Sequence, residues 1–223
     1  MNIESYYSYR FVLIPETIGS ITYISENLNH LKETVKAGYT LSCVGDDRVY
    51  SYVPSRLGDS LSDEVAKFCL DRYVGQYEHY SLLDRGSDER QYGAPGVDLP
   101  ICSVSRSKCN KYPEYHTSLD NFDVVTEEGL KGSLDLYKKM INVLENNFYP
   151  RVVVLGEPQL GKRGLFDEIV VKGSPKRIKN IKNFLALCDG NHSVINISKK
   201  LDIEFEECAE VMKILKEKNL IKV

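Results

Sequence analysis

Short apolar runs alternate with amphipathic segments before residue 150, and this alternation limits the fold more than any other feature of the sequence. Runs suited to strands lie at residues 9–14, 38–44, 49–53 and 99–104. Apolar residues recur at helical spacing in residues 17–27, 60–74 and 127–148. Strands that alternate with helices predict an α/β fold, here a partial mixed sheet flanked by helices.

The end of the chain differs in charge and in pattern. From Leu160 onward it holds 13 Lys and Arg against 9 Asp and Glu, a net charge of +4. The pattern predicts short helices and one final strand, at residues 178–188, 193–201, 204–218 and 219–223. This order is typical of a small winged-helix-like domain. We therefore expect an α/β domain over residues 1–158 and a winged-helix-like domain over residues 159–223.

Composition excludes several classes of protein. The formal net charge is -3, so no overall positive field attracts nucleic acid. No apolar run approaches the roughly 20 residues of a membrane span, and residues 1–10 do not resemble a signal peptide. The six cysteines form no C-x-x-C pair, which favours buried free thiols in a reducing compartment. We expect a cytoplasmic protein that contacts no membrane.

Three residues of the kinds that bind zinc follow predicted strands or lie in a polar loop. Glu16 follows the run at residues 9–14, Asp46 follows the run at residues 38–44, and His116 precedes the longest predicted helix. Carboxylates and imidazoles bind zinc, and α/β sheets place their sites at strand ends. Each residue alone is weak support, because such an Asp is usually a turn or a cap and such a His is usually structural. Asp47 is a weaker rival to Asp46.

The order and the neighbours of these residues resemble a known family, the co-catalytic zinc aminopeptidases. The match is closer to a subgroup of bacterial aminopeptidase-like proteins that are associated with polysaccharide biosynthesis and carry a C-terminal winged helix. The motifs that carry the resemblance are Pro-Glu-Thr-Ile-Gly-Ser (15–20), Gly-Ser-Asp-Glu-Arg-Gln-Tyr (86–92), Tyr-Pro-Glu-Tyr-His-Thr-Ser (112–118) and Gly-Glu-Pro-Gln-Leu-Gly-Lys-Arg-Gly (156–164).

This resemblance implies roles for six residues. Glu16, Asp46 and His116 would be ligands of zinc, of which the intact family can hold two ions. Asp88 and Arg90 would line the substrate pocket, although they could equally form a loop ion pair, and Tyr115 is a further candidate for lining it because it stands beside His116. Asp120 would orient the His116 ring by contacting it on the side away from the metal.

Two departures from the family pattern weaken the expectation of activity. Pro15 stands where the family has a second Glu, so Glu16 could be either the general base or a metal ligand. The family also has an earlier stretch with a His and an Asn-Asp-Asn motif, and the sequence contains nothing similar. The resemblance therefore covers the C-terminal part of the family pattern. We expect that a complementing N-terminal half or a second copy is needed, and that the chain alone is inactive.

Two classes of function remain. The first is a fragment of an aminopeptidase-like metallohydrolase, in which metal-activated water attacks an amide of a peptide or small molecule. The alternative is a non-catalytic binding or scaffold module linked to polysaccharide biosynthesis. Nucleotide binding is not expected, because Arg163 stands where the P-loop-like run 156–162 needs Ser or Thr. Nucleic acid is not expected either, because the helix predicted from Glu204 begins with four carboxylates.

Overall fold

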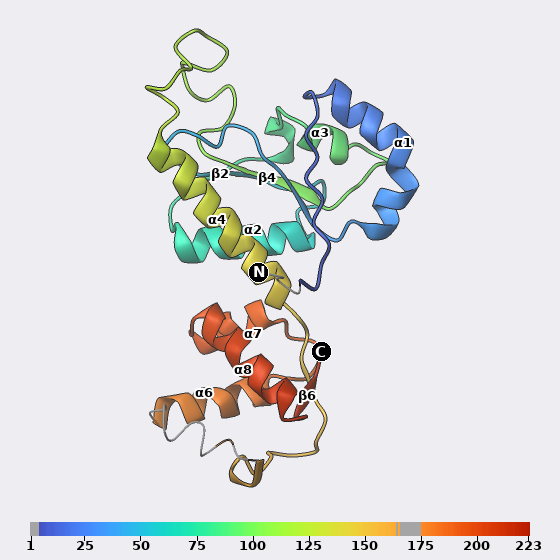
Figure 1. Cartoon of the computed structure of the whole chain (residues 1–223), viewed down its shortest axis with the longest axis vertical. Helices are drawn as coiled ribbons and strands as arrows, with labels where there is room; N and C mark the ends of the chain where they lie inside the picture. Colours follow the sequence, from blue (N-terminus) through green and yellow to red (C-terminus); the bar gives the residue numbers. More distant parts are fainter. Residues whose placement is uncertain (1–4, 164, 166–174) are drawn as a thin grey trace. The chain divides into compact units, whose positions relative to one another are not determined.

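The computed structural model describes residues 5–163, 165 and 175–223, and the chain divides into two compact units (Figure 1). Unit 1 is Met1–Asn142 and unit 2 is Val143–Val223. This division falls earlier than the expected boundary after residue 158. The reason is that β5 (Arg151–Val152) pairs with the last strand of the chain, β6 (Ile221–Lys222), so it belongs to unit 2.

A mixed four-stranded sheet forms the centre of unit 1, as expected. Its strands are β1 (Gly38–Thr40), β2 (Ser51–Val53), β3 (Glu78–His79) and β4 (Ile101–Ser105), in the order β1-β4-β2-β3. β4 pairs with β1 in parallel and with β2 in antiparallel orientation, and β2 pairs with β3 in parallel. Among the described residues, β1 and β3 are therefore the edges of this sheet.

The helices of unit 1 lie around this sheet (Figure 1). They are α1 (Ile18–Thr34), α2 (Leu61–Tyr73), α3 (Glu89–Tyr92) and α4 (Glu127–Asn146), with a 3-10 turn, η1 (Leu82–Asp84). α2 and α3 pack against β4, and α1 packs against α3. A buried cluster of Ile24, Leu31, Tyr92 and Leu99 joins α1 to the segment that leads into β4.

The sequence pattern predicted α2 correctly. Ser60 caps its N-terminus in a capping box with Asp63, which satisfies amides that the helix itself leaves unpaired. Val65, Phe68 and Cys69 are buried on the expected face.

The expected apolar stripe of α4 consists of Leu130, Leu134, Tyr137, Ile141 and Leu144, and only Leu144 and, in part, Tyr137 are buried. Leu130, Leu134 and Ile141 are 48%, 54% and 37% exposed, whereas Ser133 and Leu136 are buried. The physical reason lies in the first turn of the helix. A Cβ on Gly129 would lie 2.1 Å from the carbonyl oxygen of Gly45, so the residue without a side chain faces the main chain, and the bulkier Leu130 does not.

The strand expected at residues 9–14 was also wrong. This segment is irregular in the structure, and Phe11 and Leu13 are 87% and 95% exposed. A strand needs a neighbour to receive its hydrogen bonds. None of the amides of residues 11–14 has a hydrogen-bond partner within the described part of the chain.

Unit 2 has the winged-helix arrangement that the sequence predicts. Its helices are α6 (Pro175–Ala186), α7 (Val194–Leu201) and α8 (Phe205–Glu217), and η2 (Gly161–Arg163) is a 3-10 turn. The antiparallel pair β5-β6 closes the unit. Its core is made of fully buried apolar side chains, among them Phe184, Ile195, Ile197, Phe205 and Leu215. Across the described ranges, no helix is long and apolar enough to cross a membrane.

Candidate functional site

Asp46 lies beyond the end of β1, as expected, and its carboxylate is 5% exposed. Its two oxygens accept hydrogen bonds from the amide and the hydroxyl of Ser107, at 2.9 and 2.8 Å. The amide of Arg48 donates to the same carboxylate at 3.0 Å, and the Arg48 Nε lies 3.5 Å from it. Donors of this chain therefore surround the Asp46 carboxylate.

Arg48 connects Asp46 to the loop that carries His116. Its Nη1 donates to the Glu114 carboxylate at 3.1 Å, and its guanidinium lies 5.1 Å from the centre of the Tyr112 ring. The main-chain amide of Glu114 and, after it, the Arg48 guanidinium hold the pKa of the Glu114 carboxyl below its ordinary value. The segment after β1 and the 112–116 loop are thus joined by one charged side chain.

His116 lies at the exposed end of an aromatic stack. Its ring is parallel to that of Tyr115, with the ring centres 4.0 Å apart, and Tyr115 meets Tyr112 edge-on at 5.5 Å. His116 also has a positive φ of 59°, in the left-handed region. The Asp120 carboxylate accepts a hydrogen bond from the Tyr112 hydroxyl at 3.1 Å, not from the His116 ring for which the resemblance suggested it.

Asp88 and Arg90 contact the residue that follows Glu16. Asp88 accepts from the Thr17 amide at 2.7 Å and from the Ser20 hydroxyl at 2.8 Å. The Arg90 guanidinium donates to the Thr17 hydroxyl at 2.5 Å. The two residues therefore fix the turn around Glu16 instead of forming an ion pair with each other. Glu16 itself is exposed in this turn.

The Tyr115 ring contacts the rings of Tyr112 and His116. Burial raises the pKa of its hydroxyl, and Cys109, Cys43 and Glu16 add to this effect, while Arg90 opposes it.

The three expected zinc ligands do not make a binding site from this chain alone. Of the residues with a described position, no three or more His, Cys, Asp or Glu side chains are grouped so that they could hold a metal ion. The carboxylate oxygens of Asp46 already accept hydrogen bonds, and His116 and Glu16 are exposed. The described residues by themselves therefore do not gather Glu16, Asp46 and His116 into a metal-binding group.

Sequence reasoning missed a small cavity next to this region. It has a volume of about 10 Å³, roughly enough for one water molecule. Among its lining residues are Glu89, Lys108, Cys43 and Cys109, of which Glu89 and Lys108 are 3% and 5% exposed. One oxygen of Glu89 accepts from the Gly86 and Ser87 amides, and the other is buried without a partner among the described residues. Glu89 lies between Asp88 and Arg90, and its position in that motif was the only available signal.

The Cys109 thiol beside this cavity does not have the properties of a nucleophile. Burial raises the pKa of the Cys109 thiol, although Lys108 opposes that effect. A reactive cysteine needs a lowered pKa. All six cysteines are free, and only Cys43 is not fully buried, in agreement with the expectation of buried free thiols.

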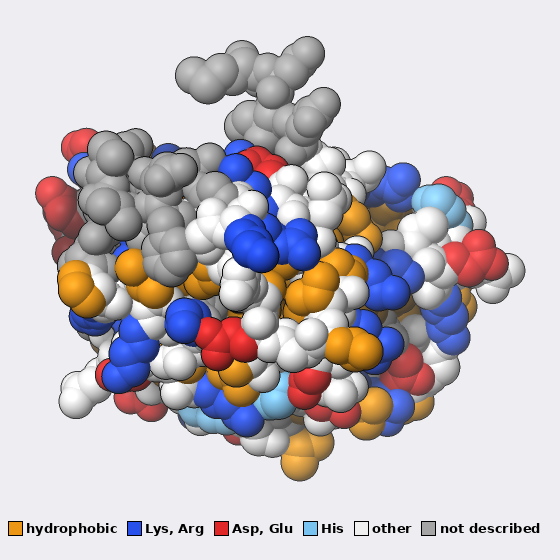
Figure 2. Space-filling model, turned by 90° about the horizontal axis from the view of Figure 1, so that it is seen from below, with side chains coloured by type: hydrophobic (Ala, Val, Ile, Leu, Met, Phe, Trp, Pro, Cys, Tyr) orange, Lys and Arg blue, Asp and Glu red, His pale blue; other side chains and the backbone are white. Residues whose placement is uncertain are grey.

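In unit 2, acidic residues of α8 contact α6. Arg177 donates to Glu210 at 2.7 Å, and the Asn180 amide donates to Glu207 at 2.7 Å. Figure 2 shows Lys and Arg side chains mixed with Asp, Glu and apolar side chains over the face that it displays. A DNA-reading surface is usually a continuous basic stripe, so this face gives no support to DNA binding.

Comparisons with known proteins agree with this architecture. The family model described as "Domain of unknown function (DUF4910)" matches residues 1–147, and a winged helix-turn-helix model matches residues 147–223. A Clostridium acetobutylicum protein is 37% identical over 206 residues, which are 91% of this chain and 47% of that protein. It is named as a candidate polysaccharide biosynthesis protein with an aminopeptidase-like domain.

Two solved structures are similar. A crystal structure of a candidate peptidase from Clostridium acetobutylicum has 35% identity and a TM-score of 0.84, and the match covers 99% of this chain and 49% of that one. An aminopeptidase from Aneurinibacillus sp. strain AM-1 has 16% identity and a TM-score of 0.47, over 56% of this chain and 30% of that one. The chain spans about half the length of the Clostridium relatives that it matches.

Proposed function

The chain belongs to the family described as domain of unknown function DUF4910, and from its relatives we propose that it is one component of an aminopeptidase-like hydrolase. Its Clostridium relatives are named for an aminopeptidase-like domain and as a candidate peptidase. The substrate class that we propose is a peptide, or another small molecule with an amide bond. The name of one relative adds a connection to polysaccharide biosynthesis.

The observation that carries this proposal is the convergence of motifs on the 112–116 loop. Arg48 joins Asp46 to Glu114 of this loop. Tyr115 of the same loop stacks on His116. Residues far apart in the sequence therefore meet at one place in unit 1, where α/β folds commonly bind ligands.

We further propose that this place becomes a zinc site only when further polypeptide completes it. In the structure Asp46 is held by Ser107 and Arg48. When bound, zinc would supply an activated water for attack on the amide. The role of this chain would be to hold Asp46, His116 and Glu16 at the site. Glu16 remains a candidate for either ligand or base.

The second candidate function is a non-catalytic binding module. It is favoured by the contacts of Asp46, because an aspartate that accepts hydrogen bonds from a serine and pairs with an arginine is commonly structural. In that case no added polypeptide would produce hydrolysis.

The test is hydrolysis of aminoacyl p-nitroanilides in the presence of Zn²⁺. The 223-residue chain is assayed alone and after co-expression with the half of the Clostridium acetobutylicum relative that it does not match. We expect no turnover by the chain alone and metal-dependent turnover by the complex. His116→Ala should abolish that turnover, whereas His30→Ala, a change at an exposed histidine of α1, should leave it unchanged.

Turnover by the chain alone would disprove the dependence on further polypeptide. A complex that forms but never hydrolyses any substrate, with or without zinc, would favour the binding module.

A further inference from the structure

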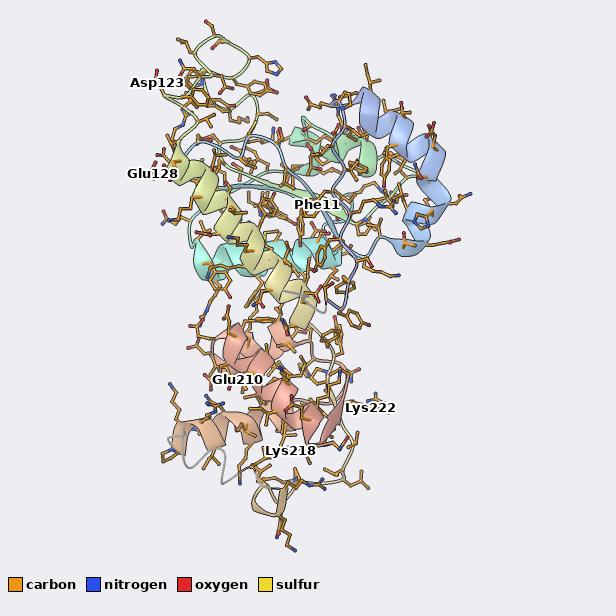
Figure 3. The ribbon with its side chains drawn as sticks, in the orientation of Figure 1. Phe11, Asp123, Glu128, Glu210, Lys218 and Lys222 are labelled. Carbon is orange, nitrogen blue, oxygen red and sulfur yellow. The ribbon has the colours of Figure 1, made fainter. Side chains whose placement is uncertain are left out.

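The N-terminal segment (residues 9–14) exposes apolar side chains in a regular order. Phe11 and Leu13 are 87% and 95% exposed, whereas Val12 is 37% exposed and Ile14 is partly buried. Exposure thus alternates with a period of two residues, which is the period of a β-strand. Figure 3 labels Phe11 on this segment.

The other side of the N-terminal segment is attached to α1. The Arg10 guanidinium donates to the Tyr23 hydroxyl at 2.9 Å. A Cβ on Gly19 would lie 2.7 Å from the Cβ of Ile14, so Ile14 packs directly over this glycine. Arg10 and Ile14 therefore fix one side of the segment, and Phe11 and Leu13 face away from it.

The main chain of the N-terminal segment is also open to a partner. Within the described part of the chain, the amides of residues 11–14 donate no hydrogen bond. Valine, isoleucine and phenylalanine favour strands, and this run contains all three. The apolar run of residues 11–14, whose amides donate no hydrogen bond within the described residues, is suited to pairing with an added strand.

The length of the relatives indicates which polypeptide would supply that strand. Nearly all of this chain matches a Clostridium acetobutylicum protein and a crystal structure from the same organism, of which it covers only 47% and 49%. In those proteins the same fold is accompanied by about as much polypeptide again. That polypeptide is a candidate to cover the side of the segment that is exposed here.

We propose that residues 10–14 are a docking strand, which pairs through its main chain with a strand of a polypeptide homologous to the unmatched half of these relatives. Phe11 and Leu13 become buried in the contact. This inference rests on the proposed function, because it identifies how the further polypeptide binds to unit 1. The experiment below distinguishes a failure of the docking strand from a failure of the proposed function.

The test uses the 223-residue chain co-expressed with the unmatched half of the Clostridium acetobutylicum relative, with an affinity tag on that half only. We expect the chain to co-purify. Hydrogen exchange of the amides of residues 11–14 should slow by at least about tenfold relative to the chain alone, because strand pairing protects them.

A variant pair separates this specific contact from non-specific hydrophobic association. Phe11→Glu with Leu13→Glu should weaken the complex by about tenfold or more, because the two side chains would be buried in it. Leu83→Glu is the matched control, since Leu83 is 82% exposed in η1 of the same unit. This control should change the affinity less than about twofold.

Three outcomes would overturn the proposal. The first is the absence of any complex, and the second is a complex in which residues 11–14 exchange as fast as in the chain alone. The third is protection of these residues in a dimer of the chain by itself, which would make a second copy the occupant. A complex in which these amides are protected but which has no hydrolytic activity would refute the proposed function and still support the docking strand.

Discussion

At the scale of single residues, Asp63 connects more parts of unit 1 than any predicted site residue does. The Tyr52 hydroxyl and the Ser55 amide donate to one of its oxygens at 2.6 and 2.9 Å. The Ser60 amide and hydroxyl donate to the other oxygen at 2.9 and 2.6 Å, and the Ser55 hydroxyl also donates to it. Burial alone would raise the pKa of Asp63, but these hydrogen bonds outweigh burial and lower it.

Asp63→Asn should therefore destabilise the chain by roughly 3 kcal/mol at pH 7, because hydrogen bonds to a charged acceptor are lost inside the protein. Since folding lowers the pKa of Asp63 below its ordinary value of 3.8, the advantage of the wild type is present above that pH. It should disappear as the pH falls through the lower, folded pKa. Urea denaturation of both proteins from pH 7 down to pH 2 measures this difference.

Asp59→Asn is the control, because Asp59 is exposed beside the same helix. It should change the free energy of unfolding by no more than about 0.5 kcal/mol. An equal loss of unfolding free energy in both variants, or a loss for Asp63→Asn that persists at low pH, would contradict a stabilising role for the hydrogen bonds to the Asp63 carboxylate.

At the scale of elements, α4 is held close to the segment that carries Asp46. A Cβ on Gly129 would lie 2.1 Å from the Gly45 carbonyl oxygen and 2.6 Å from that of Asp46. The hydroxyl of Ser133, one turn later, donates to the Val44 carbonyl at 2.7 Å. The first turns of α4 therefore support the main chain on which the Asp46 carboxylate is placed.

Gly129→Ala should cost about 2 kcal/mol of stability, because the added methyl group overlaps main-chain atoms that cannot rotate away. Helix propensity alone predicts the opposite, a gain of about 1 kcal/mol. Thermal unfolding gives the sign directly. Lys131→Ala, a change at an exposed position of the same helix, should stay within about 0.5 kcal/mol of the wild type.

The sequence predicts an element correctly when the features that form it are local. α2 was confirmed because its cap and its apolar spacing are local features: Ser60, Val65 and Phe68 lie within three turns of one another. The strand expected at residues 9–14 was wrong because a strand depends on a neighbour that local sequence does not specify. A period of two residues is nevertheless present in the structure, because the strongly exposed Phe11 and Leu13 alternate with the less exposed Val12 and Ile14.

The candidate site was only partly predictable for a related reason. Motif order indicated that Glu16, Asp88 and Arg90 belong together, and the contacts of Asp88 and Arg90 with Thr17 agree with this. The hydrogen bonds that occupy Asp46 depend on Ser107, which is distant in sequence and carries no motif of its own. The pairing of Asp120 with Tyr112 likewise results from loop geometry.

At the scale of the whole molecule, the chain combines a DUF4910 unit with a winged helix and spans about half the length of its Clostridium relatives. The residues that would bind a metal are present on the first unit, but they do not form a metal-binding group within the described part of the chain. Our central claim is that this site is completed by further polypeptide.

The zinc content of the purified 223-residue chain, measured by mass spectrometry after dialysis against Zn²⁺, tests this claim most directly. Asp46→Ala and His116→Ala are measured beside it. The account predicts that all three proteins retain the same background level of zinc. Stoichiometric zinc in the wild type that is lost in both variants would contradict it, because the chain would then assemble the site by itself.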